Sequence, residues 1–313
     1  MQNQRALVPN LRMVVLGDSV PWGQGLQTSE KFYSLVKVAL SGSDCAQSCA
    51  VLAHSGAIIG AGATTTGPIL GGEVPTAYPT ILQQCANVTD PPETVDLVLL
   101  NGGINDINVR TILNPLTDSS HLQDRIVQHC HRDMKTLLDA VLKKFTKPTC
   151  RFVVTGYFLI LSAQSDRLLM NQFLKMHGLS FASLVDLFSL INLTTDDLFQ
   201  KILNNCALFF RQSSQSLQQA VDETNQAVGG APRVFFAQPP FTEANAALAP
   251  QAWLWGLKPI LRPEDPVQDD RRAACLRDEH DLLRLPTCFL ASAGHPNLTG
   301  AQQFAAAILA ALS

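Results

Sequence analysis

Residues 12–25, "RMVVLGDSVPWGQG", run from a short apolar stretch straight into Gly-Asp-Ser and then into two more glycines. The run length and β-branched content of residues 13–16 predict a buried strand. The triplet Gly17-Asp18-Ser19 that follows is a turn signal. Several hydrolase folds place a nucleophilic serine on a tight turn at the end of a central strand. The alternative is that Asp-Ser only caps the next segment, so the rest of the chain has to decide.

The composition predicts a well-packed α/β protein. Of the 313 residues, 46% are hydrophobic and 16% are charged, which is enough apolar material for a substantial core. The net charge of −3, with no basic run, argues against a nucleic-acid partner or an anionic membrane surface. No apolar run approaches the roughly 18–20 residues of a transmembrane helix. The N-terminus lacks the apolar core of a secretory signal, so we expect a cytoplasmic protein if the chain is full length and a secreted one if it is a trimmed mature form.

The cysteines indicate neither a metal site nor a dense disulfide framework. Eight cysteines are present, but a chain of this length does not depend on disulfides for its stability. Cys130 and Cys206 fall on apolar helical faces and are expected to be small buried hydrophobic residues. Cys275 and Cys288 flank a charged loop, and this pair is a candidate disulfide. Because no CxxC pair occurs, no structural zinc site is expected.

Strand and helix patterns alternate along the chain. Short apolar runs predict strands at 12–16, 49–53, 95–100, 151–156 and 233–237. Amphipathic patterns predict helices at 29–40, 121–145, 196–228 and 299–312, with an acidic first turn in the third and a Thr299–Gln302 capping box in the last. This alternation predicts a parallel sheet with helices on both faces, in one domain over residues 1–313. Residues 238–290 are expected to form a long, irregular and functional stretch.

Further polar residues follow the predicted strands, where an open α/β sheet binds its ligands. Gly56 lies in a turn after the second strand. The third strand runs into Gly103-Ile104-Asn105-Asp106, and His295-Pro296 precedes the last helix.

These four blocks, in this order, resemble those of the SGNH hydrolases, also called the GDSL esterase/lipase superfamily. The resemblance spans residues 17–296 and therefore nearly the whole chain. It implies a three-layer α/β/α sandwich with a mostly five-stranded parallel sheet, of the SGNH or flavodoxin-like type. It also implies catalysis without a metal or a cofactor.

The resemblance assigns a role to each block. Ser19 attacks an ester carbonyl to form an acyl-enzyme, and His295 is the base that takes the serine proton. The backbone N–H groups of Ser19 and Gly56 and the side-chain amide of Asn105 form the oxyanion hole. Asp18 and Asp106 are expected to be structural, with Asp18 bonding backbone in the nucleophile turn.

One position departs from the family pattern. Family members usually carry Asp three residues before the histidine, and this chain has Ser292. Three explanations stay open. A backbone carbonyl or Ser292 itself orients His295, which we favour; a carboxylate from the long loop (Asp278, Glu279 or Asp281) takes over; or the protein is a weak or inactive enzyme.

The sequence thus predicts a hydrolase of carboxylic esters with short- to medium-chain acyl groups, acting on a small-molecule or lipid ester. The alternatives are a non-catalytic binding protein of the same fold and an acyltransferase that uses the same Ser-His site. The chain is longer than a minimal family member, and its insertions at about 160–230 and 238–290 are expected to form a lid, a substrate wall or a dimer surface. The oligomeric state is not predicted.

Two groups of conspicuous side chains have structural explanations. His121, His129 and His131 lack a metal-ligand spacing and are expected on a solvated helix face. The three tryptophans are expected either in the core or at the acyl pocket: Trp22, Trp253 and Trp255.

Overall fold

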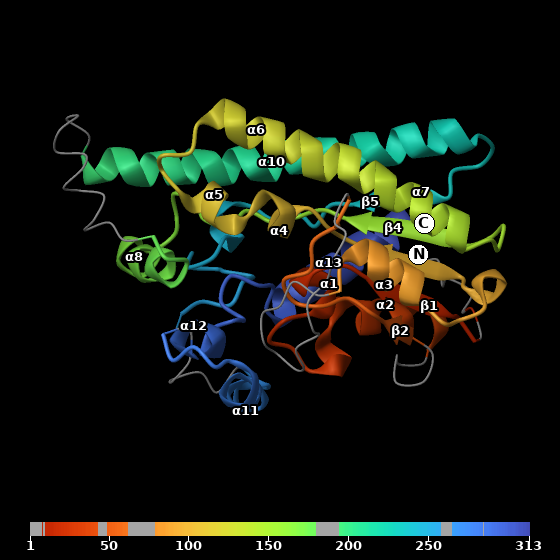
Figure 1. The fold of residues 1–313 in the computed structure, drawn as a ribbon, viewed down its shortest axis with the longest axis horizontal. Helices are drawn as coiled ribbons and strands as arrows, with labels where there is room; N and C mark the ends of the chain where they lie inside the picture. Colours follow the sequence, from red (N-terminus) through yellow and green to blue (C-terminus); the bar gives the residue numbers. More distant parts are fainter. Residues whose placement is uncertain are drawn as a thin grey trace, which may run out of the picture.

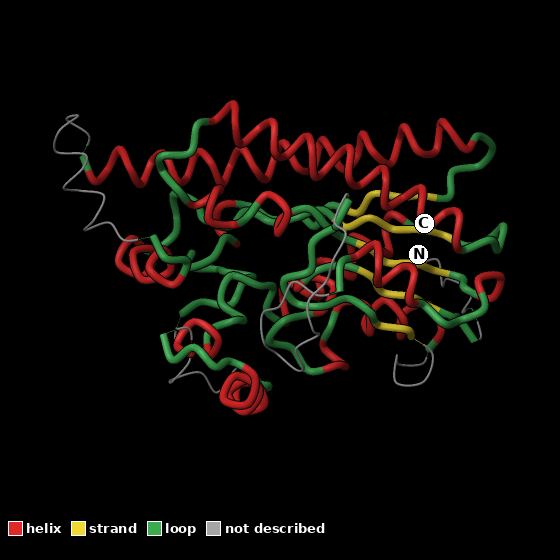
Figure 2. The backbone as a smooth tube through the Cα atoms, in the orientation of Figure 1, coloured by secondary structure: helices red, strands yellow, loops and turns green. Residues whose placement is uncertain are grey.

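The computed structural model describes residue 8 and residues 10–42, 49–61, 79–179, 194–257, 265–283 and 285–313. Its centre is one five-stranded sheet in which every neighbouring pair of strands is parallel. The strands are β1 (Met13–Leu16), β2 (Cys49–Val51), β3 (Leu97–Leu100), β4 (Arg151–Thr155) and β5 (Val234–Ala237), in the spatial order β2-β1-β3-β4-β5 (Figures 1 and 2). All five predicted strands and the predicted sheet are confirmed.

Helices cover both faces of the sheet. The helices near the sheet are α1 (Ser19–Trp22), α2 (Phe32–Ser41), α3 (Ile81–Asn87), α4 (Ile104–Ile107), α5 (Val109–Leu113), α6 (Ser119–Val127), α7 (Met134–Lys144), α10 (Thr195–Val228) and α13 (Leu298–Ala311). Short 3₁₀ turns add residues 28–30, 92–94 and 243–245. On one face α13 contacts β4 and β5 and packs on α2, with Phe32 and Phe304 stacked between the two helices. On the other face α10 contacts β5 and α7, and α7 contacts α3.

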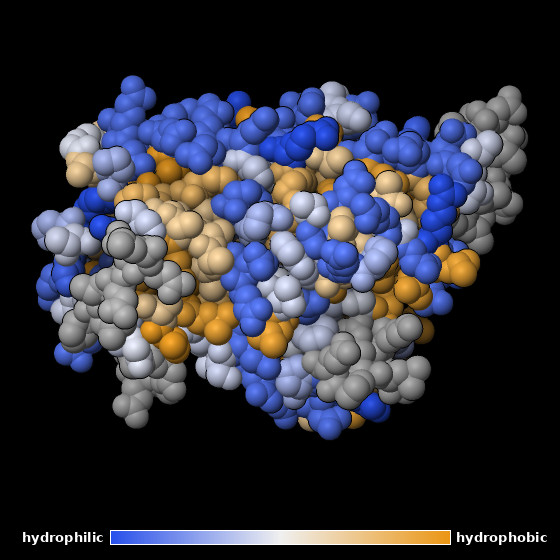
Figure 3. Space-filling model, turned by 180° about the vertical axis from the view of Figure 1, so that it is seen from behind, coloured by the Kyte–Doolittle hydropathy of each residue, from blue (hydrophilic) through white to orange (hydrophobic). Residues whose placement is uncertain are grey.

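The long helix α10 begins where its sequence predicts. Thr194 accepts a hydrogen bond from the N–H of Asp197, and the Asp197 carboxylate accepts one from the N–H of Thr194, which closes a capping box. One stripe of α10 is buried, and Figure 3 shows the edge formed by α6 and α10 covered with hydrophilic side chains. Within the part of the chain described, no helix combines the length and apolar character needed to cross a bilayer.

Two helix predictions need correction. The predicted helix 121–145 is α6 and α7 joined by a π-helical segment at residues 128–133, because an extra residue is accommodated per turn there. The last helix begins at Leu298, and its N-cap is Asn297, whose side chain accepts from the N–H of Gly300 at 3.1 Å. The proposed Thr299–Gln302 capping box is therefore wrong by two residues, since Asn297 already caps the helix.

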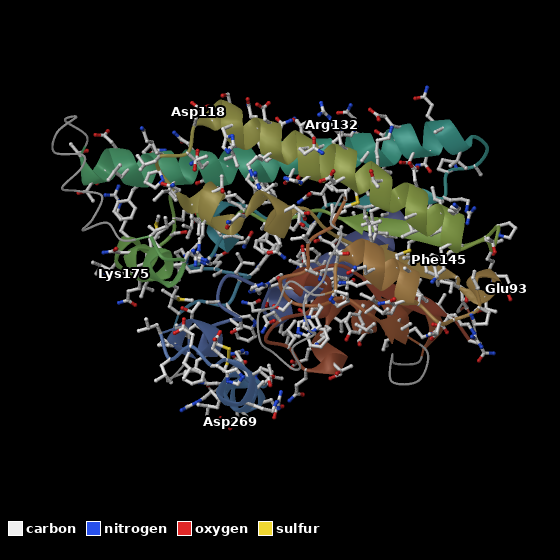
Figure 4. All side chains as sticks on the ribbon, viewed as in Figure 1. Glu93, Asp118, Arg132, Phe145, Lys175 and Asp269 are labelled. Carbon is white, nitrogen blue, oxygen red and sulfur yellow. A yellow bond between two sulfur atoms is a disulfide. The ribbon has the colours of Figure 1, made fainter. Side chains whose placement is uncertain are left out.

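The segments outside the sheet are partly helical. Helix α8 (Arg167–Met176) lies in the first insertion, and α11 (Gln268–Asp278) and α12 (Leu285–Phe289) lie in the stretch predicted to be irregular. A disulfide between Cys275 and Cys288 joins α11 to α12, as predicted, and is visible as a yellow bond in Figure 4. Cys130 and Cys206 are buried free thiols, also as predicted. Figure 1 places α8, α11 and α12 together beyond the carboxyl ends of the strands.

A buried glutamine holds the turn after β1. Gly17 has φ +140°, and a Cβ there would lie 2.6 Å from Pro21 Cγ and 2.9 Å from the Asn101 carbonyl oxygen, so glycine is required. The side chain of Gln84, on α3, accepts from the Gly17 N–H at 2.7 Å and donates to the Gly17 carbonyl at 2.9 Å. The Gly17 carbonyl also accepts from the backbone N–H of His54 at 3.0 Å, so Gln84 is the partner of the buried Gly17 N–H and one of two donors to the carbonyl.

We expect Gln84→Leu to lower the free energy of unfolding by about 1–3 kcal/mol, because it leaves the buried N–H of Gly17 without a partner. Denaturant unfolding would measure this loss. Gln219→Leu, on the exposed face of α10, is the matched control and is expected to change stability by less than about 0.5 kcal/mol. Equal stabilities for the two variants would contradict this account of Gln84.

Candidate active site

The ends of three strands and the start of the last helix meet at one place. Ser19 is the first residue of α1, directly after β1, and Gly56 lies in the loop after β2. Asn105 is in α4, after β3, and His295 precedes α13. All four residues line the same cavity, so the structure brings together the residues that the sequence singled out.

Ser19 and His295 are in hydrogen-bond contact. The His295 Nε2 atom lies 2.8 Å from the Ser19 Oγ atom, although the two residues are 276 positions apart in the chain. For Nε2 to accept the hydroxyl proton, the imidazole must carry its own proton on Nδ1. This distance is within the range required of a nucleophile and its general base.

The other side of the His295 ring faces protein backbone. Nδ1 is buried and lies near the carbonyls of Ala291, Ser292 and Ala293, without a hydrogen bond of normal geometry among the described residues. Burial lowers the pKa of His295 to about 4; the nearby carbonyls oppose this shift, whereas the charge of Arg271 adds to it. His295 is therefore neutral at pH 7.

Asp18, the residue before Ser19, has a buried carboxyl group. Asp18 caps α1 by accepting from the N–H of Val20 at 2.8 Å, which is the backbone role expected for it. The Tyr157 hydroxyl, just beyond β4, donates to the Asp18 carboxylate at 3.0 Å and accepts from the N–H of Ile104 at 3.0 Å. Burial raises the pKa of Asp18 to about 7. Through Tyr157, the turn that holds Ser19 is bonded to the turn that holds Asn105.

The residues predicted to form the oxyanion hole, Ser19, Gly56 and Asn105, line one cavity. Among the described residues, no acceptor takes the backbone N–H of Ser19 or that of Gly56, which adopts φ +77°. The Asn105 amide donates one hydrogen to the Ala57 carbonyl at 3.0 Å and keeps a second N–H. Asp106 accepts from the N–H of Ile59 with both carboxylate oxygens, at 3.1 and 3.0 Å, as expected of a structural residue. Burial raises the pKa of Asp106.

The cavity at this site has mainly apolar walls and a volume of about 300 Å³. Three of the wall residues come from α8 and the turn after it, and others come from the end of α12. The apolar wall includes Val109, Phe158, Ile160, Phe173, Met176 and Leu290. Both insertions therefore contribute side chains to the cavity.

A second histidine faces this cavity. His177 follows α8, and its ring packs edge-on against Phe173 with 4.8 Å between the ring centroids. Burial lowers the pKa of His177 to about 4, so its ring is also neutral at pH 7. Its buried Nε2 atom has no hydrogen-bond partner within the described residues.

The side chain of Ser292, three residues before His295, does not bond the His295 imidazole. The buried Ser292 hydroxyl donates to the carboxylate of Asp265 at 3.1 Å, and it makes no hydrogen bond to His295 Nδ1. The three loop carboxylates named as alternatives do not line the cavity. Asp278, for example, pairs with Arg277 at 2.8 Å.

The tryptophans and the clustered histidines lie outside the cavity. Trp22 stacks on His54, Trp253 packs against Phe241, and Trp255 is buried, which supports the core interpretation. The prediction of a solvated histidine face is wrong for two of the three. His129 Nδ1 is 2.7 Å from Asp133, and His131 Nε2 is 3.1 Å from Glu223, because the π-helical segment turns both histidines toward acidic partners. His121 is exposed.

One group in the described residues has the ligand types of a metal site. Single ligand atoms of Asp106, His129 and Asp133 lie within 4.8 Å of one another. However, Asp106 already accepts from backbone N–H groups and His129 is paired with Asp133. These protein contacts account for the group without an ion.

Several residues of the site carry no sequence signal. Gln84, Tyr157, His177, Asp265 and Arg271 belong to none of the four blocks. Tyr157 lies two residues beyond a predicted strand, and that position at a sheet edge is the one hint the sequence contained.

The chain has the fold of the SGNH, or GDSL, lipases and esterases, as the sequence resemblance implied. Among solved structures, it is similar to phospholipase A1 from Streptomyces albidoflavus, with a TM-score of 0.50 and 14% identity over 96% of this chain and 98% of that chain. The lipase Lip_vut3 from a goat rumen metagenome aligns with a TM-score of 0.45 and 13% identity, over 96% and 97% of the two chains. A protein described as a GDSL-like lipase from Parabacteroides merdae aligns at 0.41 and 13%, over 98% and 97%. No protein-family model and no curated protein matches the chain.

We expect His295 and His177 to titrate near pH 4 and to stay neutral at pH 6, because burial disfavours both imidazolium forms. NMR of ¹³C-labelled histidine side chains across pH 3.5–8 measures this directly. The variants His295→Asn and His177→Asn assign the two signals. A pKa near 6.5 for His295 would contradict the burial that the structure gives this ring.

Proposed function

We propose that this protein is a serine hydrolase of carboxylic esters, in which Ser19 is the nucleophile and His295 is the general base. The observation that carries the proposal is the 2.8 Å contact between His295 Nε2 and Ser19 Oγ, two residues that line a mainly apolar cavity. An unassisted hydroxyl is a poor nucleophile, and a neutral imidazole at this distance is positioned to remove its proton. The fold shared with a phospholipase supports the same class of reaction.

The proposed reaction has two steps. The Ser19 oxygen attacks the ester carbonyl as its proton passes to His295 Nε2, and His295 then protonates the departing alcohol, which leaves an acyl-enzyme. Water enters, gives a proton to His295 and attacks the acyl carbonyl, and the proton returns to Ser19 as the carboxylic acid leaves. In both steps the oxyanion is stabilised by the N–H groups of Ser19 and Gly56 and the Asn105 amide, where loss of one donor typically costs about 10²–10³ in rate.

The proposed substrates are esters with short- to medium-chain acyl groups, and the size and lining of the cavity support this proposal. Its volume of about 300 Å³ is at the lower end of the roughly 300–1,000 Å³ range of ligand pockets, and its apolar wall suits a hydrocarbon chain. The insertions that contain α8 and α12 then act as the substrate wall. The binding-protein alternative keeps the same cavity but requires an unreactive Ser19.

We expect Ser19→Ala to abolish hydrolysis of p-nitrophenyl esters, with a fall in kcat of about 10⁴-fold or more, since the acyl-enzyme can no longer form. A fluorophosphonate probe should label Ser19 in the wild type and be located there by mass spectrometry. Ser34→Ala is the control: Ser34 is buried in α2 and its hydroxyl has no partner among the described residues, so activity should not change. An unlabelled, inactive wild type would favour the binding protein.

The cavity wall predicts the acyl-length preference. Across p-nitrophenyl esters from acetate to palmitate, kcat/KM should peak at short to medium chains and fall at palmitate. Met176→Ala, which shortens a side chain in the wall, should move the peak toward longer chains, because each extra buried methylene contributes about 1 kcal/mol. Leu168→Ala, on the exposed side of the same helix, should leave the profile unchanged. Identical profiles for both variants would show that acyl chains bind elsewhere.

A further inference from the structure

A buried ion pair lies behind the turn that carries His295. Arg271 donates to both carboxylate oxygens of Asp265, from Nη1 at 2.7 Å and from Nη2 at 3.0 Å. The side chains are only 0% and 1% exposed, respectively, so the pair is shielded from water and fixed in one geometry. The Cys275–Cys288 disulfide holds α11, which contains Arg271, against α12.

Ser292 connects this ion pair to the histidine turn. Its hydroxyl donates to the same Asp265 oxygen that Arg271 Nη1 contacts, at 3.1 Å. Its carbonyl accepts from the backbone N–H of His295 at 2.9 Å. The same turn is also bonded to the backbone of Trp255. The N–H of Gly294 donates to the Trp255 carbonyl, and the N–H of Trp255 donates to the His295 carbonyl, each at 2.8 Å.

The anchored turn supplies the polar groups that face the imidazole. The carbonyls of residues 291–293 lie near Nδ1 and raise the pKa of the ring, and Ser292 is the middle residue of the three. Those carbonyls favour a proton on Nδ1, which leaves Nε2 free to accept from Ser19. Their orientation depends on where Ser292 is held, and Ser292 is held by Asp265.

We propose that Asp265 is the positioning residue of His295, acting through the Ser292 hydroxyl and fixed in place by Arg271. In the SGNH pattern an aspartate contacts the imidazole itself. Here the Asp265 carboxylate contacts the Ser292 hydroxyl, and so orients the turn that carries His295 instead of its ring. This inference rests on the proposed function. A purely structural role is the competing explanation, because buried ion pairs also occur without a part in catalysis.

The first test is Ser292→Ala, which removes one hydroxyl and leaves the ion pair intact. We expect kcat on p-nitrophenyl butyrate to fall by roughly 10- to 100-fold, as misplaced catalytic groups do, with KM changed less than about twofold. Ser213→Ala is the matched control, since Ser213 is a buried serine on α10 that bonds a backbone carbonyl far from the cavity. Assays well below the melting temperatures of both variants separate positioning from unfolding.

The tautomer of His295 is a readout that a merely structural role would not move. In ¹⁵N-histidine NMR, the signal that disappears in His295→Asn should show the Nδ1–H form in the wild type. Ser292→Ala should give a mixture of both tautomers, whereas Ser213→Ala should match the wild type. An unchanged tautomer together with an unchanged kcat in Ser292→Ala would overturn the proposal.

Two further variants keep the test decisive if Ser292→Ala does not fold. The double variant Asp265→Leu/Arg271→Met replaces the ion pair by apolar side chains and should lose kcat as Ser292→Ala does. Ser292→Asp should also lower kcat, because it sets a second carboxylate against Asp265. A higher kcat in Ser292→Asp would overturn the anchor and point to a missing carboxylate at the ring.

These outcomes are distinct from those that test the proposed function. If the wild type neither hydrolyses esters nor reacts with the fluorophosphonate probe, the Ser19–His295 mechanism itself fails. If the wild type is active and labelled while all three anchor variants keep wild-type kcat, only the role of Asp265 fails.

Discussion

The contact between Ser19 Oγ and His295 Nε2, at 2.8 Å, depends on bringing the two ends of the chain to the same point. The sheet makes this possible because all its strands are parallel and their carboxyl ends lie at one edge. The first strand delivers Ser19 there directly, and the last crossover returns the chain for the turn before α13. Polar bonds to the turn after β1 and to the turn before α13 fix the backbone that carries these two side chains.

The proposed nucleophile, Ser19, and the proposed base, His295, are held by separate polar networks. On the nucleophile side, Gln84 bonds both backbone groups of Gly17, and Tyr157 joins Asp18 to the loop of Asn105. These bonds come from α3, which packs against β1, and from the loop just after β4. On the base side, the turn of His295 is bonded to Trp255 and, through Ser292, to the α11–α12 segment. The two halves of the site therefore rest on different parts of the chain.

The sequence was sufficient for the strands and for the four blocks, because these are local signals. A short apolar run ending in glycine and polar residues specifies a buried strand and its turn without reference to distant contacts. The supporting residues could not be found in this way. Gln84 and Gly17 are 67 positions apart, and Arg271 acts on His295 from a segment whose helices the sequence did not reveal. The N-cap of the last helix is a local case: Thr299 and Asn297 both suit an N-cap, and only the backbone of the structure shows that Asn297 is the cap.

Among the described residues no carboxylate bonds Nδ1, so the proposed base His295 has a different balance of properties from the histidine of a Ser-His-Asp triad. In a triad, the buried aspartate stabilises the imidazolium that forms as the serine proton is removed. Within the described part of this protein, burial lowers the pKa of His295 to about 4, carbonyl dipoles oppose that shift, and the Arg271 guanidinium adds to it. A base with so low a pKa is neutral and available across the physiological range, but it accepts a proton with less driving force than one whose pKa lies near the working pH. Fixed geometry is the compensation open to such a site, because a ring already aimed at Ser19 loses little to reorganisation during proton transfer.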